Sequence, residues 1–503
     1  MSHRAQLGVV VVCLVAAACS ATKSAEVASV KSGAQVAAPS AAAPAFDVEP
    51  YRTIVDALSS NGLNSNGAYR MLNALCTTAP HRLSGSGDAA TAIKWAQEAM
   101  KSAGLTNVHT EPVMVPHWVR GDRAYLRQVD EVTSLSPNSG LPEFELLALG
   151  GSVSTPEAGL TGGVVEVKSF DELHALGDKA RGKFVFFNRP MDRSKDPFAA
   201  YGGAVDQRGH GAVEAAKVGA IGAIVRSMTM SDDFSPHTGA MGYEEGVAKV
   251  PAVAISTKSA DRLSSMVKAD AEMKLWLNLN CQWLEDAPSF NVVGEVVGSE
   301  TPDEIVVVGG HLDNWDVGQG ANDDGAGCMH ALEAARLINA LPRHPRRTIR
   351  VVFFINEENG SRGAAAYYEA HKAEMDKHVL ALESDRGGFS PRGFETDASP
   401  ENLATLRGIV PLLEPLGIDW VRNGHGGVDI RPMAKSGVIT VGFVPDPQRY
   451  FDFHHSERDT LDNVHPRELE LGAAAIAGFL YVIADMPTAL PHNPPPPPKP
   501  ETK

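Results

Sequence analysis

The sequence predicts an α/β protein built on a doubly wound, mostly parallel sheet that is interrupted by an inserted, mainly β domain. Three observations predict this class. Hydrophobic residues make up 43% of the 503-residue chain, which is ample for one large or two medium cores. Apolar strand patterns alternate with helical patterns in the C-terminal half, as in sheets covered by helices on both faces. A stretch rich in Gly and Val, with several short strands, precedes that half.

Two blocks of sequence come before the alternating region. The first block, residues 47–130, contains helical periodicity: Ile93, Ala96 and Met100 are spaced to form one apolar face of a helix over residues 89–103. The second block, residues 131–279, predicts short strands with one helix before the third of them. We expect these strands at residues 163–167, 183–187, 220–225 and 250–255, and the helix at residues 211–218.

The third block, residues 280–486, alternates strands and helices. We expect strands at residues 303–310, 348–355 and 438–444, and a helix at residues 326–341. In open parallel sheets, functional groups gather at the carboxyl ends of the strands. We therefore expect the first and third blocks to form one domain that carries the functional site, with the second block inserted into it.

The N-terminus indicates an export signal, because Arg4 precedes an apolar run over residues 8–18 that is too short to span a bilayer. The small residues before Cys19 resemble a bacterial lipoprotein processing site, at which Cys19 would become lipidated. Ala16 stands where such sites prefer Leu, so ordinary signal cleavage stays open. We expect a signal peptide over residues 1–19, a tether over 20–46 and a proline-rich tail over 487–503. The mature protein is then exported, either to the periplasm or cell envelope as a lipoprotein or by secretion.

The charge and cysteine content narrow the choice of partners. The formal net charge of −16 repels phosphate backbones, so we expect no nucleic-acid partner, and membrane contact only through the lipid anchor. The sequence leaves open whether the chain forms a homodimer. Outside the signal, Cys76, Cys281 and Cys328 show no C-x-x-C spacing, so no thiolate metal site is predicted, although export permits one disulfide among them.

Polar side chains follow the apolar segments of the third block, close to the points where the strands end. They are His311, Asp313, Asp323, Glu357, Glu358, Asp385 and His455. Imidazoles and carboxylates are the groups that bind zinc, at about 2.0–2.2 Å. A single catalytic zinc ion needs only three protein ligands, so five convergent ligands indicate two metals about 3.5–4 Å apart that share one bridging carboxylate.

The motifs Gly-His-x-Asp, Gly-Ala-Asn-Asp-Asp-Gly-Ala-Gly, Glu-Glu-x-Gly, Glu-Ser-Asp and His-Ser-x-x-Asp-Thr stand in this order in the third block. The series resembles the co-catalytic zinc exopeptidases of clan MH, the family of leucyl aminopeptidases and plasma glutamate carboxypeptidase (carboxypeptidase Q). Residues 80–86 are similar to an early loop of that family, and the second block is similar to its protease-associated insert. The resemblance covers most of residues 47–486. It implies a metallo-exopeptidase that hydrolyses dipeptides or terminal residues of short peptides.

The resemblance implies a ligand role for five residues of this chain. His311 and Asp385 would bind one zinc ion, Glu358 and His455 would bind the other, and Asp323 would bridge the two. His454 is an alternative to His455, but His455 stands directly before the Ser-x-x-Asp-Thr motif, as the family ligand does. Carboxylate-rich sites also accept Mn or Co, so the choice of zinc rests largely on the resemblance.

The remaining roles concern catalysis and substrate binding. Glu357 would be the general base that takes a proton from the attacking water, and Asp313 would orient His311. Adjacent glutamates in an extended chain point in opposite directions, so Glu358 can bind metal while Glu357 faces the water. His425 and Tyr450 are candidates for the substrate pocket, and each is otherwise an ordinary loop or core residue. The family pattern also implies a cis peptide bond after Asp323.

Two other functions fit the same motifs. A glutaminyl cyclase-like enzyme would have the same fold and bind a single zinc ion. A non-catalytic binding protein similar to the transferrin receptor would have the same fold and bind no zinc ion. Retention of all five ligand positions favours the two-metal enzyme over both. The sequence does not distinguish an aminopeptidase from a carboxypeptidase, because the groups that grip a substrate terminus lie on loops.

Overall fold

The computed structural model describes residues 46–129 and 143–494. The predicted signal peptide with Cys19, and most of the predicted tether, lie outside the described residues. Contacts within the chain separate Met1–Ala45 from Phe46–Lys503, and the helices and strands belong to the second unit. Among the helices of the described residues, none combines the length and the apolar character needed to cross a bilayer.

The central sheet has eight strands in the order β1-β9-β11-β10-β12-β15-β13-β14. Its four middle strands run parallel: β11 (Arg347–Phe354), β10 (Thr301–His311), β12 (His378–Glu383) and β15 (Ile439–Pro445). Around them lie β1 (Thr106–Val119), β9 (Gln282–Val296), β13 (Pro391–Thr396) and β14 (Trp420–Asn423), with antiparallel pairing where β1 meets β9, β9 meets β11 and β13 meets β15. The predicted doubly wound, mostly parallel sheet is confirmed.

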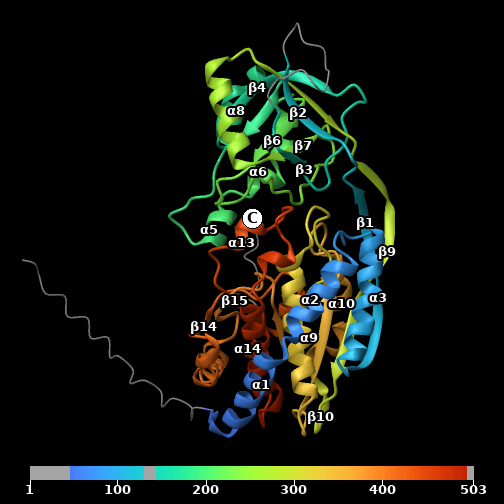
Figure 1. Cartoon of the computed structure of the whole chain (residues 1–503), viewed down its shortest axis with the longest axis vertical. Helices are drawn as coiled ribbons and strands as arrows, with labels where there is room; N and C mark the ends of the chain where they lie inside the picture. Colours follow the sequence, from blue (N-terminus) through green and yellow to red (C-terminus); the bar gives the residue numbers. More distant parts are fainter. Residues whose placement is uncertain (1–45, 130–142, 495–503) are drawn as a thin grey trace, which may run out of the picture. The chain divides into compact units, whose positions relative to one another are not determined.

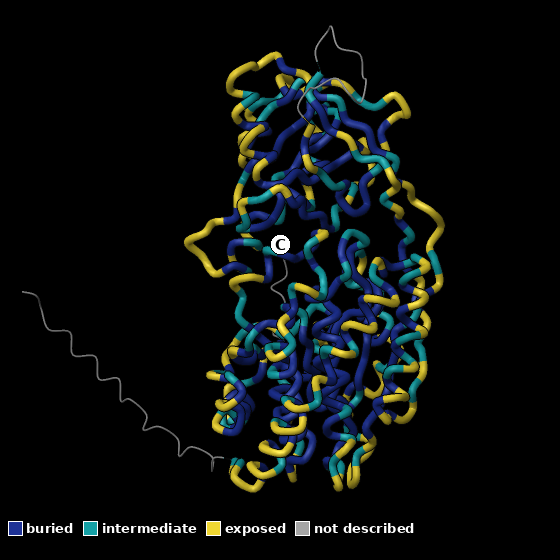
Figure 2. Tube along the Cα trace, in the orientation of Figure 1, coloured by how far each residue is buried: buried dark blue, intermediate teal, exposed yellow. Residues whose placement is uncertain are grey.

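Helices cover this sheet on both faces because its middle strands are apolar on both sides. In β10, Val306 and Val308 join the core under one layer of helices, whereas Ile305 and Val307 pack on the opposite face. The first layer contains α1 (Arg52–Ser65), α2 (Gly67–Thr78), α3 (Gly87–Ser102), α9 (Ala326–Asn339) and α14 (Pro466–Asp485), and α10 (Arg362–His371) covers the other face (Figure 1). Figure 2 shows the trace of these strands as buried.

The inserted block forms a second sheet of seven strands in the order β2-β8-β4-β5-β6-β7-β3. The strands are β2 (Ala124–Val129), β3 (Leu146–Ala148), β4 (Leu160–Val167), β5 (Phe184–Phe187), β6 (Gly222–Arg226), β7 (Ala252–Ile255) and β8 (Lys274–Leu279). Helices accompany them: α4 (Phe170–Leu176), α5 (Pro197–Gly202), α6 (Asp206–Gly209), α7 (Gly211–Lys217) and α8 (Thr257–Ala269).

The second sheet begins earlier in the sequence than the expected boundary at residue 131. After β1 the chain turns at Gly121, which has a positive φ of 76°, and β2 then pairs antiparallel with β8. Residues 124–129 therefore belong to the second sheet, although their composition does not separate them from the first block. Strand β9 runs beside β1 along its length and returns the chain to the central sheet (Figure 1).

Candidate metal centre

The polar residues that follow the strands of the central sheet meet in space. His311 is the last residue of β10, the two glutamates follow β11, and Asp385 follows β12. Asp323 lies in the turn before α9, and His455 follows β15 and the short helix α13 (Tyr450–Phe453). Because parallel strands end at the same edge of a sheet, residues far apart in sequence converge there.

Asp323 lies between the two imidazoles. Its Oδ1 is 3.3 Å from Nε2 of His311, and its Oδ2 is 3.3 Å from Nε2 of His455. Each imidazole nitrogen also faces a second carboxylate, at 3.5 Å to Oδ1 of Asp385 and 3.0 Å to Oε2 of Glu358. The five predicted ligands thus form two histidine–carboxylate pairs that share Asp323.

The donor set fits divalent cations. Asp323 Oδ2 and Asp385 Oδ1 are buried and, among the described residues, accept no hydrogen bond. Carboxylates this close repel one another, and a buried negative charge is costly unless a cation balances it. His311, Asp323 and Asp385 form one group with ligand atoms near enough to hold a metal ion, and Asp323, His454 and His455 form another.

The mutual electrostatics of these residues are strong. Burial opposes ionisation of Asp323, but the nearby imidazoles of His311 and His455 outweigh burial and hold the pKa of the carboxyl well below its usual value. Burial likewise disfavours the charged ring of His455, yet the negative charges of Glu358 and Asp323 raise its pKa to about 10. The ionised form of Asp323 and the protonated form of His455 therefore stabilise each other in the protein alone.

Glu357 stands beside this cluster on a turn. The turn follows Asn356, which has a positive φ of 70°. The two glutamates therefore do not lie in an extended chain, and the expected alternation of side chains along a strand does not explain their different directions. Burial raises the pKa of the Glu357 carboxyl well above its usual value, and the charges of Asp385 and Glu358 add to this rise. A carboxyl with a raised pKa holds a proton more readily at neutral pH.

Asp313 acts on this region through two different groups. Its main-chain carbonyl, and not its side chain, lies 2.9 Å from Nδ1 of His311. Its carboxylate instead accepts hydrogen bonds from the backbone N–H groups of Asn356 and Glu357, at 2.6 and 3.2 Å, and from the hydroxyl of Ser84 at 3.0 Å. The side chain therefore supports the turn that carries Glu357, while the backbone orients His311.

Other carboxylates hold the turn that carries Asp323. Asp459 accepts hydrogen bonds from the backbone N–H groups of Asn322 and Asp323, at 2.7 and 3.0 Å. The carboxylate of Asp324 accepts from the N–H groups of His311 and Gly327, both at 3.0 Å. The peptide bond between Asp323 and Asp324 is cis, as the resemblance implies.

His454 and His455 stack on each other, with ring centroids 3.5 Å apart. Nε2 of His454 is 3.7 Å from Asp323, whereas Nε2 of His455 is 3.3 Å from it. Of these two histidines, His455 is the one that also contacts Glu358. The inserted block contacts both residues: the backbone N–H of Thr238 donates to the carbonyl of His455 at 2.9 Å, and Nδ1 of His237 lies 2.6 Å from the carbonyl of His454.

A cavity of about 280 Å³ opens onto the cluster. Its lining combines residues of the inserted block with residues of the rest of the chain. The inserted block contributes Phe198, Tyr201 and Arg208, and the rest of the chain contributes Asp323, Glu357, Glu358, Asp385, Val428, Tyr450, Phe451, His454 and His455. Tyr450 is therefore at the cavity, as the sequence suggested. His425 is exposed and does not line it.

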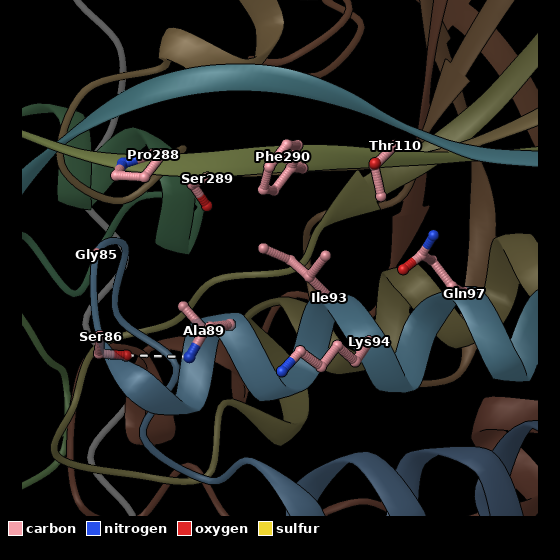
Figure 3. Close-up of a pocket in the computed structure, with 11 residues that line it drawn as sticks. Gly85, Ser86, Ala89, Ile93, Lys94, Gln97, Thr110, Pro288, Ser289 and Phe290 are labelled. Carbon is pink, nitrogen blue, oxygen red and sulfur yellow. Dashed lines mark hydrogen bonds between the residues drawn. The ribbon is translucent and has the colours of Figure 1, made fainter.

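A second cavity, of about 250 Å³, lies between α3 and strands β1 and β9 (Figure 3). In the close-up, Ile93 and Ala89 of α3 point toward Phe290 and Ser289 of β9. Lys94 is the one ionisable residue in its lining, and none of the predicted ligands reaches it. This cavity lacks the groups that the predicted chemistry requires.

Sequence reasoning missed two contributors to the site, Arg208 and Arg82. Arg208 comes from the inserted block and carries no motif of its own, whereas Thr238 of the same block lies in a stretch, residues 237–239, that is similar to matching stretches of the carboxypeptidase group. Arg82 is fully buried and donates hydrogen bonds to the carbonyls of Leu312 and Gly320, so it ties the loop of residues 80–86 to the segment before Asp323. The similarity of residues 80–86 to a loop of the family was the one signal in the sequence that pointed to Arg82.

Comparison with known proteins agrees with this geometry. Residues 291–480 match the model of peptidase family M28. Carboxypeptidase Q of Bos taurus is 38% identical over 436 residues, which is 87% of this chain and 89% of that protein. A crystal structure of a peptidase M28 precursor from Shewanella amazonensis has a TM-score of 0.84 at 35% identity, over 89% of this chain and 100% of that chain. A zinc aminopeptidase from Bacillus subtilis shares the fold, with a TM-score of 0.62 at 18% identity over 84% and 96% of the two chains.

Fold, site and relatives together define a metallo-exopeptidase, and the chain belongs to peptidase family M28. Within this family of zinc enzymes it is carboxypeptidase Q-like. The predicted reaction class is thereby confirmed, and peptides are its substrates.

Proposed function

We propose that this exopeptidase binds two zinc ions and hydrolyses dipeptides or terminal residues of short peptides. His311 and Asp385 would hold one ion, His455 and Glu358 would hold the other, and Asp323 would be shared between them. One observation carries the proposal: the two oxygens of Asp323 face different imidazoles, and each imidazole faces a further carboxylate. His455 is preferred to His454 because it contacts two carboxylates of the cluster.

Cations bound there would polarise the scissile carbonyl and lower the pKa of an attacking water molecule. The protein supplies the proton transfers. Glu357 lines the cavity beside the ligands, accepts a proton from the water at its carboxylate and delivers it to the leaving amine. Asp313 holds the backbone of Glu357 and so keeps this carboxylate facing the cavity. Burial of Glu357 favours the protonated state between the two transfers.

The inserted block is proposed to limit the length of the substrate. Phe198, Tyr201 and Arg208 come from this block and line the cavity together with the ligands. A peptide that enters must fit between these side chains and the cluster, which suits dipeptides and short peptides better than folded proteins. If the purified enzyme digests a folded protein as fast as a dipeptide, this part of the proposal is wrong.

Export as a lipoprotein is proposed from the sequence at residues 1–19. A short apolar run is followed by small residues and Cys19, which suits cleavage before Cys19 and its acylation. The protein would then be held at the cell envelope by its lipid. The mass of the mature protein tests the proposal: acyl groups on Cys19 support it, and an unmodified residue favours plain secretion.

Elemental analysis combined with a panel of dipeptides tests the main proposal. Two zinc ions per chain and hydrolysis that a chelator abolishes are the expected results. One ion per chain, with cyclisation of N-terminal glutamine, would instead favour the glutaminyl cyclase-like alternative. Binding of peptides without turnover at full metal loading would favour the non-catalytic alternative.

A further inference from the structure

A second cluster of histidine and glutamate side chains lies at the edge of the central sheet, on elements that carry none of the predicted ligands. His109 and Glu111 belong to the edge strand β1, where a spacing of two residues places them on the same face of the strand. His371 is the last residue of α10, and Glu374 follows three residues later, which makes the two side chains neighbours at the end of the helix. We call these four residues the edge cluster.

Glu111 joins the two histidines of the edge cluster. Its Oε1 lies 2.7 Å from Nε2 of His371 and 3.4 Å from Nε2 of His109. Nδ1 of His371 lies 4.0 Å from Oε2 of Glu374. The side chain of Glu111 is only 13% exposed, and its Oε2 is buried and accepts no hydrogen bond from the described residues. No lysine or arginine in residues 46–129 and 143–494 lies within ion-pair distance of this carboxylate. A carboxylate in such a place favours a cation as its partner.

The backbone fixes the tautomer of His109. Asn107 has a positive φ of 51° and lies where the pairing of β1 with β9 is irregular, and its carbonyl is 2.6 Å from Nδ1 of His109. Because a carbonyl oxygen only accepts, Nδ1 carries the hydrogen, and the lone pair of the neutral ring is on Nε2. That lone pair faces the oxygen of Glu111, an arrangement that a cation between the two would stabilise. Histidines that bind metal usually have such a contact from their other ring nitrogen.

We propose that His109, Glu111 and His371 bind a zinc ion, separate from the cluster around Asp323. Two imidazoles and one carboxylate are a ligand set that suits zinc, whereas magnesium and calcium prefer oxygen ligands. When Nε2 of His371 binds the ion, its hydrogen moves to Nδ1, which faces Glu374. The side chain of His109 is 48% exposed, so its ring is free to turn toward an ion that enters from solvent. The ion ties the edge strand β1 to the end of α10.

This site should bind zinc more weakly than the cluster around Asp323. It offers three protein ligands, one of them half exposed, and it has no carboxylate shared between two ions. Protein that is loaded with zinc and then desalted should therefore keep the ions of the cluster around Asp323 and release the ion of the edge cluster. The inference does not rest on the proposed function, because the two sites share no residue.

Calorimetric titration of zinc into the full chain, after zinc loading and desalting, tests the inference. The wild type should bind one further ion in a saturable step, and magnesium should produce no such step. His109→Ala and Glu111→Gln should each weaken the step by at least about 10- to 100-fold, because loss of a group that merely orients a ligand already costs this much. The half-exposed position of His109 and the matching shape of glutamine should leave the fold intact. Each variant should therefore retain as many zinc ions after desalting as the wild type does.

His174→Ala is the matched control. His174 lies 2.7 Å from a carboxylate oxygen of Glu214, the same distance as between His371 and Glu111. The other partner of Glu214 is Lys217, at 3.0 Å, and not a second imidazole. This variant should bind the further zinc ion as tightly as the wild type.

Two results would overturn the inference. One is the absence of a further binding step in the wild type at millimolar zinc. The other is a step of equal strength in the wild type, His109→Ala and Glu111→Gln, which would indicate an adventitious surface ion only. Both results leave the proposed metallopeptidase function intact. A failure of that function would show instead as absent peptide hydrolysis by protein that keeps its zinc after desalting.

Discussion

Glu357 and Glu358 are neighbours in the chain and serve different purposes at the site. Oε2 of Glu358 lies 3.0 Å from His455, whereas Glu357 is tied through its backbone N–H to Asp313 and lines the cavity. The turn after Asn356, and not strand alternation, separates them. The pair offers a matched test of which carboxylate moves protons and which holds metal.

We expect Glu357→Gln to lower kcat for a dipeptide by at least about 100-fold, because the amide cannot accept the proton of the attacking water. The zinc content of this variant should equal that of the wild type. Glu358→Gln, the matched control, should lose zinc as well as activity, because it removes a proposed ligand. Kinetics and elemental analysis on the same samples decide the matter, and undiminished turnover in Glu357→Gln would remove it from the mechanism.

Among elements, α14 and α2 meet at a buried carboxyl. Glu470 of α14 accepts a hydrogen bond from the backbone N–H of Tyr69 at 3.1 Å, and its second oxygen has no partner among the described residues. Burial, with a further contribution from Glu333, raises the pKa of Glu470 to about 7. The folded protein therefore binds this proton more strongly than the unfolded chain does.

The sign of the pH dependence follows from this shift. The group contributes stability that is fully present below about pH 4.5 and is lost as the pH rises through about 7. At pH 8, Glu470→Gln should therefore have a free energy of unfolding about 1–3 kcal/mol higher than that of the wild type, measured by denaturant unfolding. This difference should vanish near pH 4.5. Glu98→Gln on α3, whose side chain is 72% exposed, should show no such difference. A constant offset across the pH range would contradict the assignment.

The segment between β6 and β7 contacts the residues that follow β15. A Cβ on Gly239 would lie 2.7 Å from Nδ1 of His455 and would also collide with Arg208, and the φ of Gly239 is 136°. Thr238 of the same segment donates to the carbonyl of His455. Close approach of this segment to His455 thus depends on the absence of a side chain.

Gly239→Ala should weaken zinc binding by about 10- to 100-fold, because groups that orient a ligand contribute this much to metal affinity. Competition with a chromophoric chelator measures the affinity directly. Gly246→Ala is the control, since Gly246 also has a positive φ but no atom within 4 Å of its added Cβ. Equal affinities of the two variants would show that the segment does not support His455.

At the scale of the whole molecule, the metal should stabilise the fold. The cluster holds the buried Asp323 and Glu358 and the partly exposed Asp385 close together, and their mutual repulsion remains when no cation is bound. A ligand that binds only the folded state stabilises it by about 2.7 kcal/mol at a concentration 100 times its Kd.

Removal of metal by a chelator should therefore lower the midpoint of thermal unfolding, and added zinc should restore it in a concentration-dependent way. Calorimetry of the apo and zinc-loaded protein measures the difference. The variant Glu358→Gln should recover less than the wild type, because one proposed ligand is missing. A midpoint that does not respond to zinc would place the metal site outside the folded core.

The sequence by itself determined the fold class and the set of residues that converge. Strands at residues 303–310 and 348–355 and the helix at 326–341 appear as β10, β11 and α9 within a few residues, because burial on two faces leaves a continuous apolar run. The polar residues after those strands meet because parallel strands end at one edge. The local pattern of apolar runs followed by polar residues is therefore enough to predict both the strands and the residues that meet at their ends.

Only the tertiary structure decided what surrounds the cluster. Arg208 and His455 are separated by 247 positions, and nothing in the sequence near either residue records their contact. The same holds for the carbonyl of Asp313 that orients His311, for the exposed position of His425, and for the start of the second sheet at Ala124. Such features depend on how separate elements pack and on which backbone groups remain free, and hydrophobic periodicity reports neither.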